Sequence, residues 1–128
     1  MWLEHLHSKE ALDRIFKDEI FGETIELRRM SFEDLDTKIK FDLREWPKNA
    51  PRKWTEQNFN TVQIVLVLGR CSEIHLKDWA IDNVGEFRVK KIEGTELYSF
   101  KFVSASGAYF SCMCDVLLFS KVSAYQNA

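Results

Sequence analysis

The sequence predicts an α+β fold in which one N-terminal α-helix packs on a mostly antiparallel β-sheet of six to eight strands. Two observations support this prediction. Apolar residues recur at helical spacing between Ser8 and Gly22, and with a period of two over most of the chain that follows. Short clusters of Gly, Asp, Asn and Ser separate the period-two segments, which favours antiparallel neighbours and a meander-like C-terminal half.

The N-terminal segment has the signals of an amphipathic helix. Ser8 is the expected N-cap, and Gly22 suits a left-handed exit from the helix. Charged residues occupy the opposite side, as expected of a solvated face. The apolar stripe expected to pack on the sheet is Leu12, Ile15, Phe16 and Ile20.

The first strands follow Gly22. Ile25 and Leu27 alternate with charged residues, and the same alternation returns over residues 38–43. The acidic stretch 33–36 is the expected hairpin connection. Pro47 ends the second strand and opens an irregular loop. Residues 61–68 are almost continuously apolar and β-branched, which predicts a central strand covered on both faces.

The remaining strands form the predicted meander. An alternation restarts at Ile74 and is expected to extend as far as Ile81. Strands are expected over residues 87–92 and 97–102, followed by a turn at 104–107. The segment from Tyr109 to Val122 is expected to be one long closing strand.

The length and charge of the chain restrict its class. The 128 residues include 18 Lys+Arg and 20 Asp+Glu, a net charge of −2, and 45% are hydrophobic. A chain of this length normally forms one domain with its own core, so residues 1–128 are expected to form a single domain. The slightly acidic balance argues against nucleic acid or an anionic membrane as the partner.

The termini and cysteines indicate a cytoplasmic protein. Residues 1–7 lack the basic start and apolar stretch of a secretion signal. No apolar run approaches the roughly 20 residues needed to span a bilayer. Three cysteines, Cys71, Cys112 and Cys114, cannot all pair within one chain and are expected to be reduced thiols.

Signatures of catalysis and metal binding are missing or weak. The chain has no phosphate-binding glycine loop and no nucleophile elbow. His5-x-His7 and Cys112-x-Cys114 have spacings that allow chelation, but structural zinc sites favour other spacings. We expect core cysteines and surface histidines, no cofactor, and no enzymatic activity.

Two local features have both a structural and a binding interpretation. Trp46 and Trp54 flank a loop that contains two prolines; they either anchor this loop or expose an aromatic recognition surface, and anchoring is favoured. The acidic residues are either solvated or a docking surface for a basic partner, and solvation is favoured. They are Glu33, Asp34, Asp36, Asp42 and Glu45.

Several landmarks together carry a resemblance over nearly the whole chain. They are Trp2, the P-x-x-W element at 51–54, the stretch 59–62 that leads into an apolar strand, the stretch 74–79, and the ending 122–125. In order and spacing the chain resembles the immunity protein 50 family of bacterial polymorphic toxin systems. The resemblance implies a cytoplasmic antitoxin, encoded beside a toxin, that binds the toxin domain and blocks it. It supplies no set of binding residues.

The mechanism that the resemblance implies is occlusion of the cleft of a cognate toxin domain. A basic toxin would meet carboxylates, so the expected contacts are Glu33, Asp34, Asp36, Asp42 and Glu45, with Trp46 and Trp54 as a second surface.

Two alternatives remain open from the sequence. A small-ligand-binding sandwich or barrel would line a cavity with Phe100, Phe102 and Phe110. An enzyme would need a cleft where His75 or Cys71 meets an acidic residue. The sequence does not determine the oligomeric state.

Overall fold

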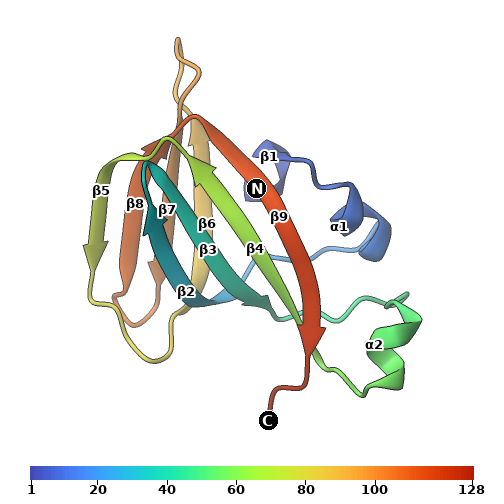
Figure 1. Ribbon diagram of the computed structural model, residues 1–128. Helices are drawn as coiled ribbons and strands as arrows, with labels where there is room; N and C mark the ends of the chain where they lie inside the picture. Colours follow the sequence, from blue (N-terminus) through green and yellow to red (C-terminus); the bar gives the residue numbers. More distant parts are fainter.

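The computed structural model describes all residues from Met1 to Ala128 and contains one nine-stranded sheet with short helices beside it (Figure 1). The α+β class is confirmed, with one strand more than expected. The helices are η1 (Trp2–His5, a 3-10 turn), α1 (Glu10–Ile15) and α2 (Arg52–Glu56). The strands are β1 (Leu6–His7), β2 (Ile25–Glu33), β3 (Asp36–Leu43), β4 (Thr61–Gly69), β5 (Ser72–Lys77), β6 (Val84–Lys91), β7 (Tyr98–Ser104), β8 (Tyr109–Cys114) and β9 (Val116–Tyr125).

The sheet bends into two halves that face each other. Its order is β1-β9-β4-β3-β2-β6-β7-β8-β5, and every pairing is antiparallel except that of β1 with β9. β2 and β6 share only two residue pairs, at the beginnings of both strands. The half that contains β9, β4, β3 and β2 therefore lies in front of the half formed by β6, β7, β8 and β5 (Figure 1).

A single core fills the space between the halves. It contains 24 buried residues, with phenylalanines from both halves. The buried Trp2 ring packs edge-to-face on Phe41 of β3 and on Phe87 of β6, with ring centroids 5.6 Å apart in both cases. The indole N–H of Trp2 donates to the carbonyl of Gly22 at 2.8 Å. Trp2 therefore joins the two halves through both apolar and polar contacts.

The N-terminal helix is shorter than the sequence predicted. α1 ends at Ile15, and no side chain caps its first turn. Ser8 has a left-handed backbone (φ 63°) and is not the cap. Leu12 and Phe16 are buried as expected, but Ile20 is 79% exposed because the chain has left the helix before reaching it.

Gly22 has the predicted left-handed conformation for a different reason. Its φ is +80°, but it lies well beyond the end of α1. A Cβ at this position would lie 2.9 Å from the Trp2 ring. Glycine is therefore required by the close approach of an indole, and not by a helix cap.

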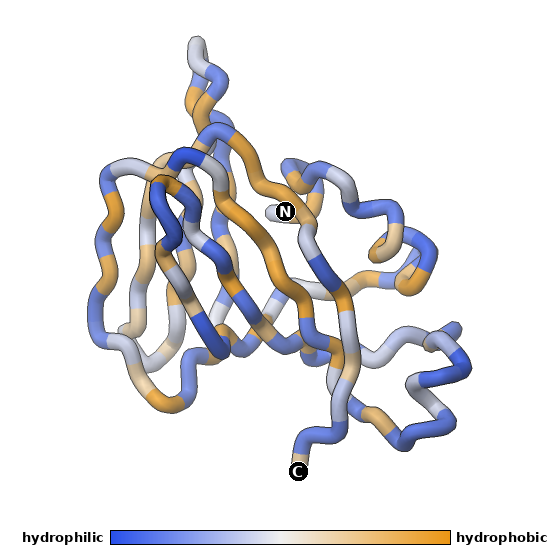
Figure 2. The backbone as a smooth tube through the Cα atoms, viewed as in Figure 1, coloured by the Kyte–Doolittle hydropathy of each residue, from blue (hydrophilic) through white to orange (hydrophobic).

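The predicted strands around β4 are largely confirmed. Side chains of β4 alternate between buried and half-exposed, so the expectation of cover on both faces holds for one face only. Figure 2 shows the apolar character of β4 and of the upper part of β9. The alternation predicted to extend from Ile74 to Ile81 ends at Lys77, and Trp79 and Ile81 lie in the following loop.

The long closing strand predicted from Tyr109 to Val122 is two strands. β8 pairs with β7 and β5, whereas β9 crosses to the other half and pairs with β4 and β1. The break is at Asp115, whose N–H donates to the carbonyl of Gly69 at 3.0 Å. One straight strand cannot pair in both halves, so the chain leaves the first ladder before entering the second.

The loop between β3 and β4 contains α2, which the sequence did not predict. Neither α2 nor any other helix of the chain has the length and apolar character needed to cross a bilayer.

Candidate partner-binding surface

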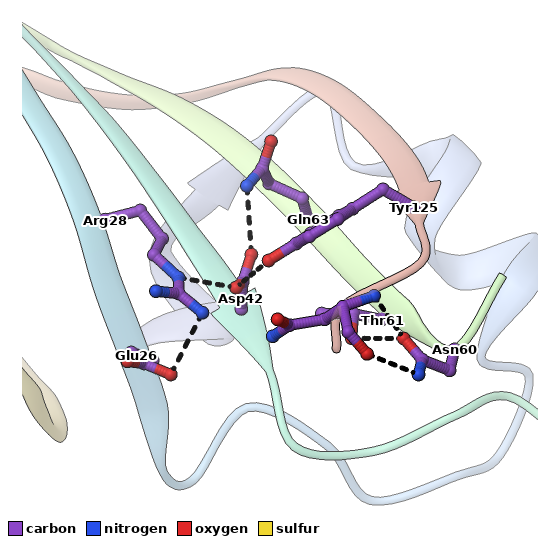
Figure 3. A network of polar contacts seen from close by, with 8 residues as sticks. Glu26, Arg28, Asp42, Asn60, Thr61, Gln63 and Tyr125 are labelled. Carbon is purple, nitrogen blue, oxygen red and sulfur yellow. Dashed lines mark hydrogen bonds and ion pairs between the residues drawn. The ribbon is translucent and has the colours of Figure 1, made fainter. Parts of the chain in front are cut away.

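A buried carboxylate on the outer face of the sheet connects four strands. Asp42 of β3 is 3% exposed. It accepts hydrogen bonds from Arg28 Nε of β2 at 2.7 Å, Gln63 Nε2 of β4 at 3.0 Å and the Tyr125 hydroxyl of β9 at 2.5 Å (Figure 3). Arg28 Nη2 also lies 3.3 Å from Glu26 Oε1. The pairing and hydrogen bonds compensate for the burial of the carboxylate.

The same contacts shift two proton affinities. The hydrogen bond to Asp42 raises the pKa of the Arg28 guanidinium, against the opposing effect of burial. Burial, and then the hydrogen bond to Asp42, raise the pKa of the Tyr125 hydroxyl. Both groups keep their protons at neutral pH, so Arg28 is a permanent cation held in one position on β2.

An irregularity in β2 places two consecutive arginines on the outer face. Leu27 pairs with Phe41 and Arg29 with Lys40, so Arg28 is an extra residue in β2. Such a bulge interrupts the alternation of side chains between the faces. Leu27 is buried, whereas Arg28 and Arg29 are both exposed. The bulge therefore gives this face an additional cation.

A polar hollow of about 370 Å³, here called the basic hollow, lies on the outer face of β2, β3, β4 and β9. Four of its lining residues are cations, and its one carboxylate, Glu33, lies 3.8 Å from Lys38 Nζ. The hollow therefore suits an anionic group better than an apolar ligand. Its lining is Arg29, Ser31, Glu33, Lys38, Lys40, Gln63, Val65, Ser120, Lys121 and Ser123.

Large exposed apolar side chains lie between the end of β2 and the region of β5. Six of the nine exposed large hydrophobic side chains belong to the end of β2, its turn, β5 and the loop after β5: Phe32, Leu35, Ile74, Leu76, Trp79 and Ile81. Phe32, Leu76 and Trp79, here called the apolar seam, line one hollow of about 320 Å³ with Met30, Arg28 and Arg29. Figure 2 shows apolar residues along β5, the outermost strand of its half. The three seam residues therefore form one exposed apolar patch, and such patches are typical of interaction surfaces, whereas single exposed hydrophobic residues are not.

Three of the residues predicted to bind a partner lie together at the turn between β2 and β3. Glu33, Asp34 and Asp36 are exposed. Asp34 has a left-handed backbone (φ 55°), which suits a tight turn. Asp36 Oδ1 accepts a hydrogen bond from the N–H of Arg70 at 3.2 Å, and Glu33 is also part of the basic hollow. The turn therefore adjoins both the basic hollow and the apolar seam.

The other four predicted residues belong to the opposite end of β3 and to the loop after it. Asp42 is buried in the network already described. Glu45 Oε1 accepts a hydrogen bond from the N–H of Gly22 at 2.9 Å. Trp46 and Trp54 pack on each other with ring centroids 5.9 Å apart, and Trp54 is buried. In this structure these side chains hold loops and strands in place.

The sequence did not reveal the two hollows. Arg29 and Lys40 lie on the two strands of the predicted hairpin, but Lys121 is distant in the chain, and only the pairing of β4 with β3 and β9 brings it to the same face. The seam had a weak signal, because Leu76 and Trp79 belong to the alternation that was predicted to start at Ile74. The structure places Leu76 on β5, in which every residue is exposed, and Trp79 in the loop after it.

The cysteines form a buried group. Cys112 Sγ lies 3.9 Å from Cys71 Sγ, and donation of its S–H lowers the pKa of Cys71 to about 7. Hydrogen bonding to Cys114 and Cys71, together with burial, raises the pKa of Cys112. All three thiols are free and buried, and no group of three or more His, Cys, Asp or Glu side chains is arranged to hold a metal ion.

The alternative functions find little support in the geometry. Phe100, Phe102 and Phe110 are almost fully buried and fill the core beside Phe87, with ring centroids 5.0 to 6.3 Å apart. None of them lines the hollows described here. His75 is exposed on β5 and makes no hydrogen bond or ion pair with a carboxylate.

Comparison with known proteins gives one match. The model of a protein family described as Immunity protein 50 matches residues 8–125. No curated protein and no solved structure matches the chain.

Proposed function

The chain belongs to the Immunity protein 50 family, and from this premise we propose that it neutralises a cognate bacterial toxin domain by binding it and occluding its active site. The family match over residues 8–125 is the observation that supports this function. In this proposal the protein acts in the cytoplasm, by binding and not by catalysis.

The apolar seam is the surface best suited to dock the toxin. Trp and Arg are enriched among the residues that dominate protein–protein binding, and the seam offers Trp79 beside Arg28 and Arg29. The exposed carboxylates Glu33 and Asp34 flank it at the turn. We propose that the seam supplies the anchors and that these carboxylates, with Asp36, form the rim. Asp42 then supports the surface by holding Arg28, whereas Glu45, Trp46 and Trp54 hold the loops at the opposite end of β3.

A preformed surface suits inhibition by occlusion. The Asp42 network holds Arg28 before any partner arrives. Phe32 and Leu76 of the seam lie on β2 and β5 of the sheet, and Trp79 lies in the loop directly after β5. Binding to a surface that is already ordered costs less conformational entropy. Rim charges affect the association rate more than the final affinity, so the anchors are expected to determine the lifetime of the complex.

Co-expression with the toxin domain encoded beside this protein tests the proposal. We expect survival of cells that otherwise die, a complex on size-exclusion chromatography, and loss of toxin activity at equal molar amounts. Phe32→Ala combined with Trp79→Ala should weaken binding by tenfold or more, about the loss expected for an interface anchor.

Ile20→Ala is the matched control, because Ile20 is an exposed apolar residue outside the seam. It should protect cells as well as the wild type does. Killing that continues in the absence of any complex would refute the proposed function. Full protection by the folded double variant would instead show that the toxin docks elsewhere.

A further inference from the structure

Three cations form a row across the outer face of the first half of the sheet. Arg29 of β2 is the partner of Lys40 of β3, Lys40 is the partner of Val65 of β4, and Val65 is the partner of Lys121 of β9. The side chains of Arg29, Lys40 and Lys121 therefore lie in line across four strands and within the basic hollow. We call these three residues the cation row.

Two irregularities align the row. The extra residue Arg28 shifts the register of β2 just before Arg29. In β9 the register shifts between the partners of Val65 and Leu66, so that Ser120 is the extra residue beside Lys121. Bulges reorient side chains and are often found at functional sites. Both bulges act here on the same face and at the same level of the sheet.

The cation row is expected to destabilise the sheet. Like charges on directly opposed residues of neighbouring strands are destabilising, and Arg29 opposes Lys40. No carboxylate lies within 4 Å of any cation of the row, whereas nearby Arg28 and Lys38 both have an acidic partner. A local rule that is broken without compensation within the fold is characteristic of a functional site.

We propose that the cation row binds an acidic segment of the partner protein. This inference rests on the proposed function and adds the chemistry of the partner's surface. Neighbouring strands are about 4.8 Å apart, so the row is roughly 15 Å long. Alternate residues of an extended segment lie about 7 Å apart, which matches two or three carboxylates. Hydroxyl groups of Ser31, Ser120 and Ser123 line the same hollow and can donate to carboxylate oxygens.

An acidic protein segment fits the hollow better than a nucleic acid does. Glu33 lines the hollow outside the cation row, where it would repel a phosphate backbone that is charged at every nucleotide, whereas a segment with two or three carboxylates can place all of them on the row. The chain has a net charge of −2, so it lacks the long-range attraction of nucleic-acid-binding proteins. The partner is therefore expected to carry carboxylates at this face, in contrast to the basic toxin surface expected from the sequence.

Fluorescence polarisation with a labelled oligo-glutamate peptide tests the proposal without the toxin. The variant Lys40→Glu with Lys121→Glu reverses the row, and Lys53→Glu with Lys90→Glu makes the same change of charge at exposed positions on α2 and β6. At low salt we expect wild-type binding that weakens with added salt. The row variant should lose about tenfold or more in affinity, and the control less than about twofold. Because it removes like-charge repulsion, the row variant should melt no lower than the wild type.

The proposal is wrong if the wild type does not bind the peptide, if both charge-reversed variants lose affinity equally, or if single-stranded DNA binds more tightly than the peptide.

The same variants in complex with the toxin domain separate the two proposals. Weaker binding by the row variant alone supports both. A complex unaffected by the row variant overturns this inference and leaves the proposed function intact. Peptide binding by the row in a protein that forms no toxin complex refutes only the proposed function.

Discussion

At the scale of single residues, Asp42 shows how neighbours change the role of a side chain. Its alternation with Phe41 places it on the outer face of β3, where a carboxylate is expected to be solvated. Arg28, Gln63 and Tyr125 cover it from three other strands. A residue expected to meet a partner is therefore also a structural acceptor that positions the arginine beside the seam.

We predict that Asp42→Asn lowers the free energy of unfolding by about 2 to 3 kcal/mol, because an amide cannot accept from all three donors and leaves the Arg28 guanidinium with Glu26 as its one acidic partner. This cost is below the roughly 3 to 5 kcal/mol expected when a fully buried ion pair is broken, because the Arg28 side chain is 35% exposed. Urea denaturation followed by circular dichroism measures the change.

Tyr125→Phe is the matched control for this measurement. It removes one neutral donor and leaves the ion pair in place, so its expected cost is about 1 kcal/mol. A loss in Asp42→Asn no larger than that in Tyr125→Phe would contradict the structural role assigned to the carboxylate.

At the scale of elements, the bend between β2 and β6 decides the architecture. Gly85 pairs with Ile25 of β2 on one side and with Ser104 of β7 on the other. A Cβ on Gly85 would lie 2.1 Å from the Val103 carbonyl oxygen. A side chain here would therefore force β6 away from β7, at a residue through which β6 also pairs with β2.

We predict that Gly85→Ala destabilises the protein by about 3 kcal/mol or more, because the backbones of β6 and β7 must move apart at a residue that also pairs with β2. Gly94→Ala is the control. No atom lies within 4 Å of its added Cβ, and its positive φ alone should cost about 1 kcal/mol. Thermal melts of both variants check the difference, and equal melting temperatures would contradict a close approach at Gly85.

At the scale of the whole molecule, the two halves share one core although only two residue pairs join their strands. Trp2 contacts Phe41 in one half and Phe87 in the other. Neither half encloses this core without the other, so residues 1–128 are expected to unfold as one cooperative unit.

We predict coincident urea transitions by tryptophan fluorescence and by far-ultraviolet circular dichroism. Trp2→Ala should lower the free energy of unfolding by about 3 to 5 kcal/mol, since it leaves a cavity between the halves. Trp79→Ala, at an exposed position, should change it by less than about 0.5 kcal/mol. Two separate transitions would show that the halves are independent domains.

The sequence by itself determined the α+β class, most strand positions and the family. Strand alternation and turn residues are local properties, and they marked β2, β3, β4, β6 and β7 correctly. The resemblance to the immunity protein 50 family, carried by landmarks such as Trp2 and the segment 51–54, is confirmed by the family match.

Only the tertiary structure decided which residues share a surface. The bulges at Arg28 and Ser120 depend on which strands pair and in which register. The alternation of apolar residues within one segment specifies neither the partner strand nor the register. The break at Asp115 likewise follows from a strand that must leave one half of the sheet and enter the other. Arg29, Lys40 and Lys121 are 11 to 92 positions apart in the chain. They meet because backbone hydrogen bonds between distant strands, and not neighbouring residues, set the register of the sheet.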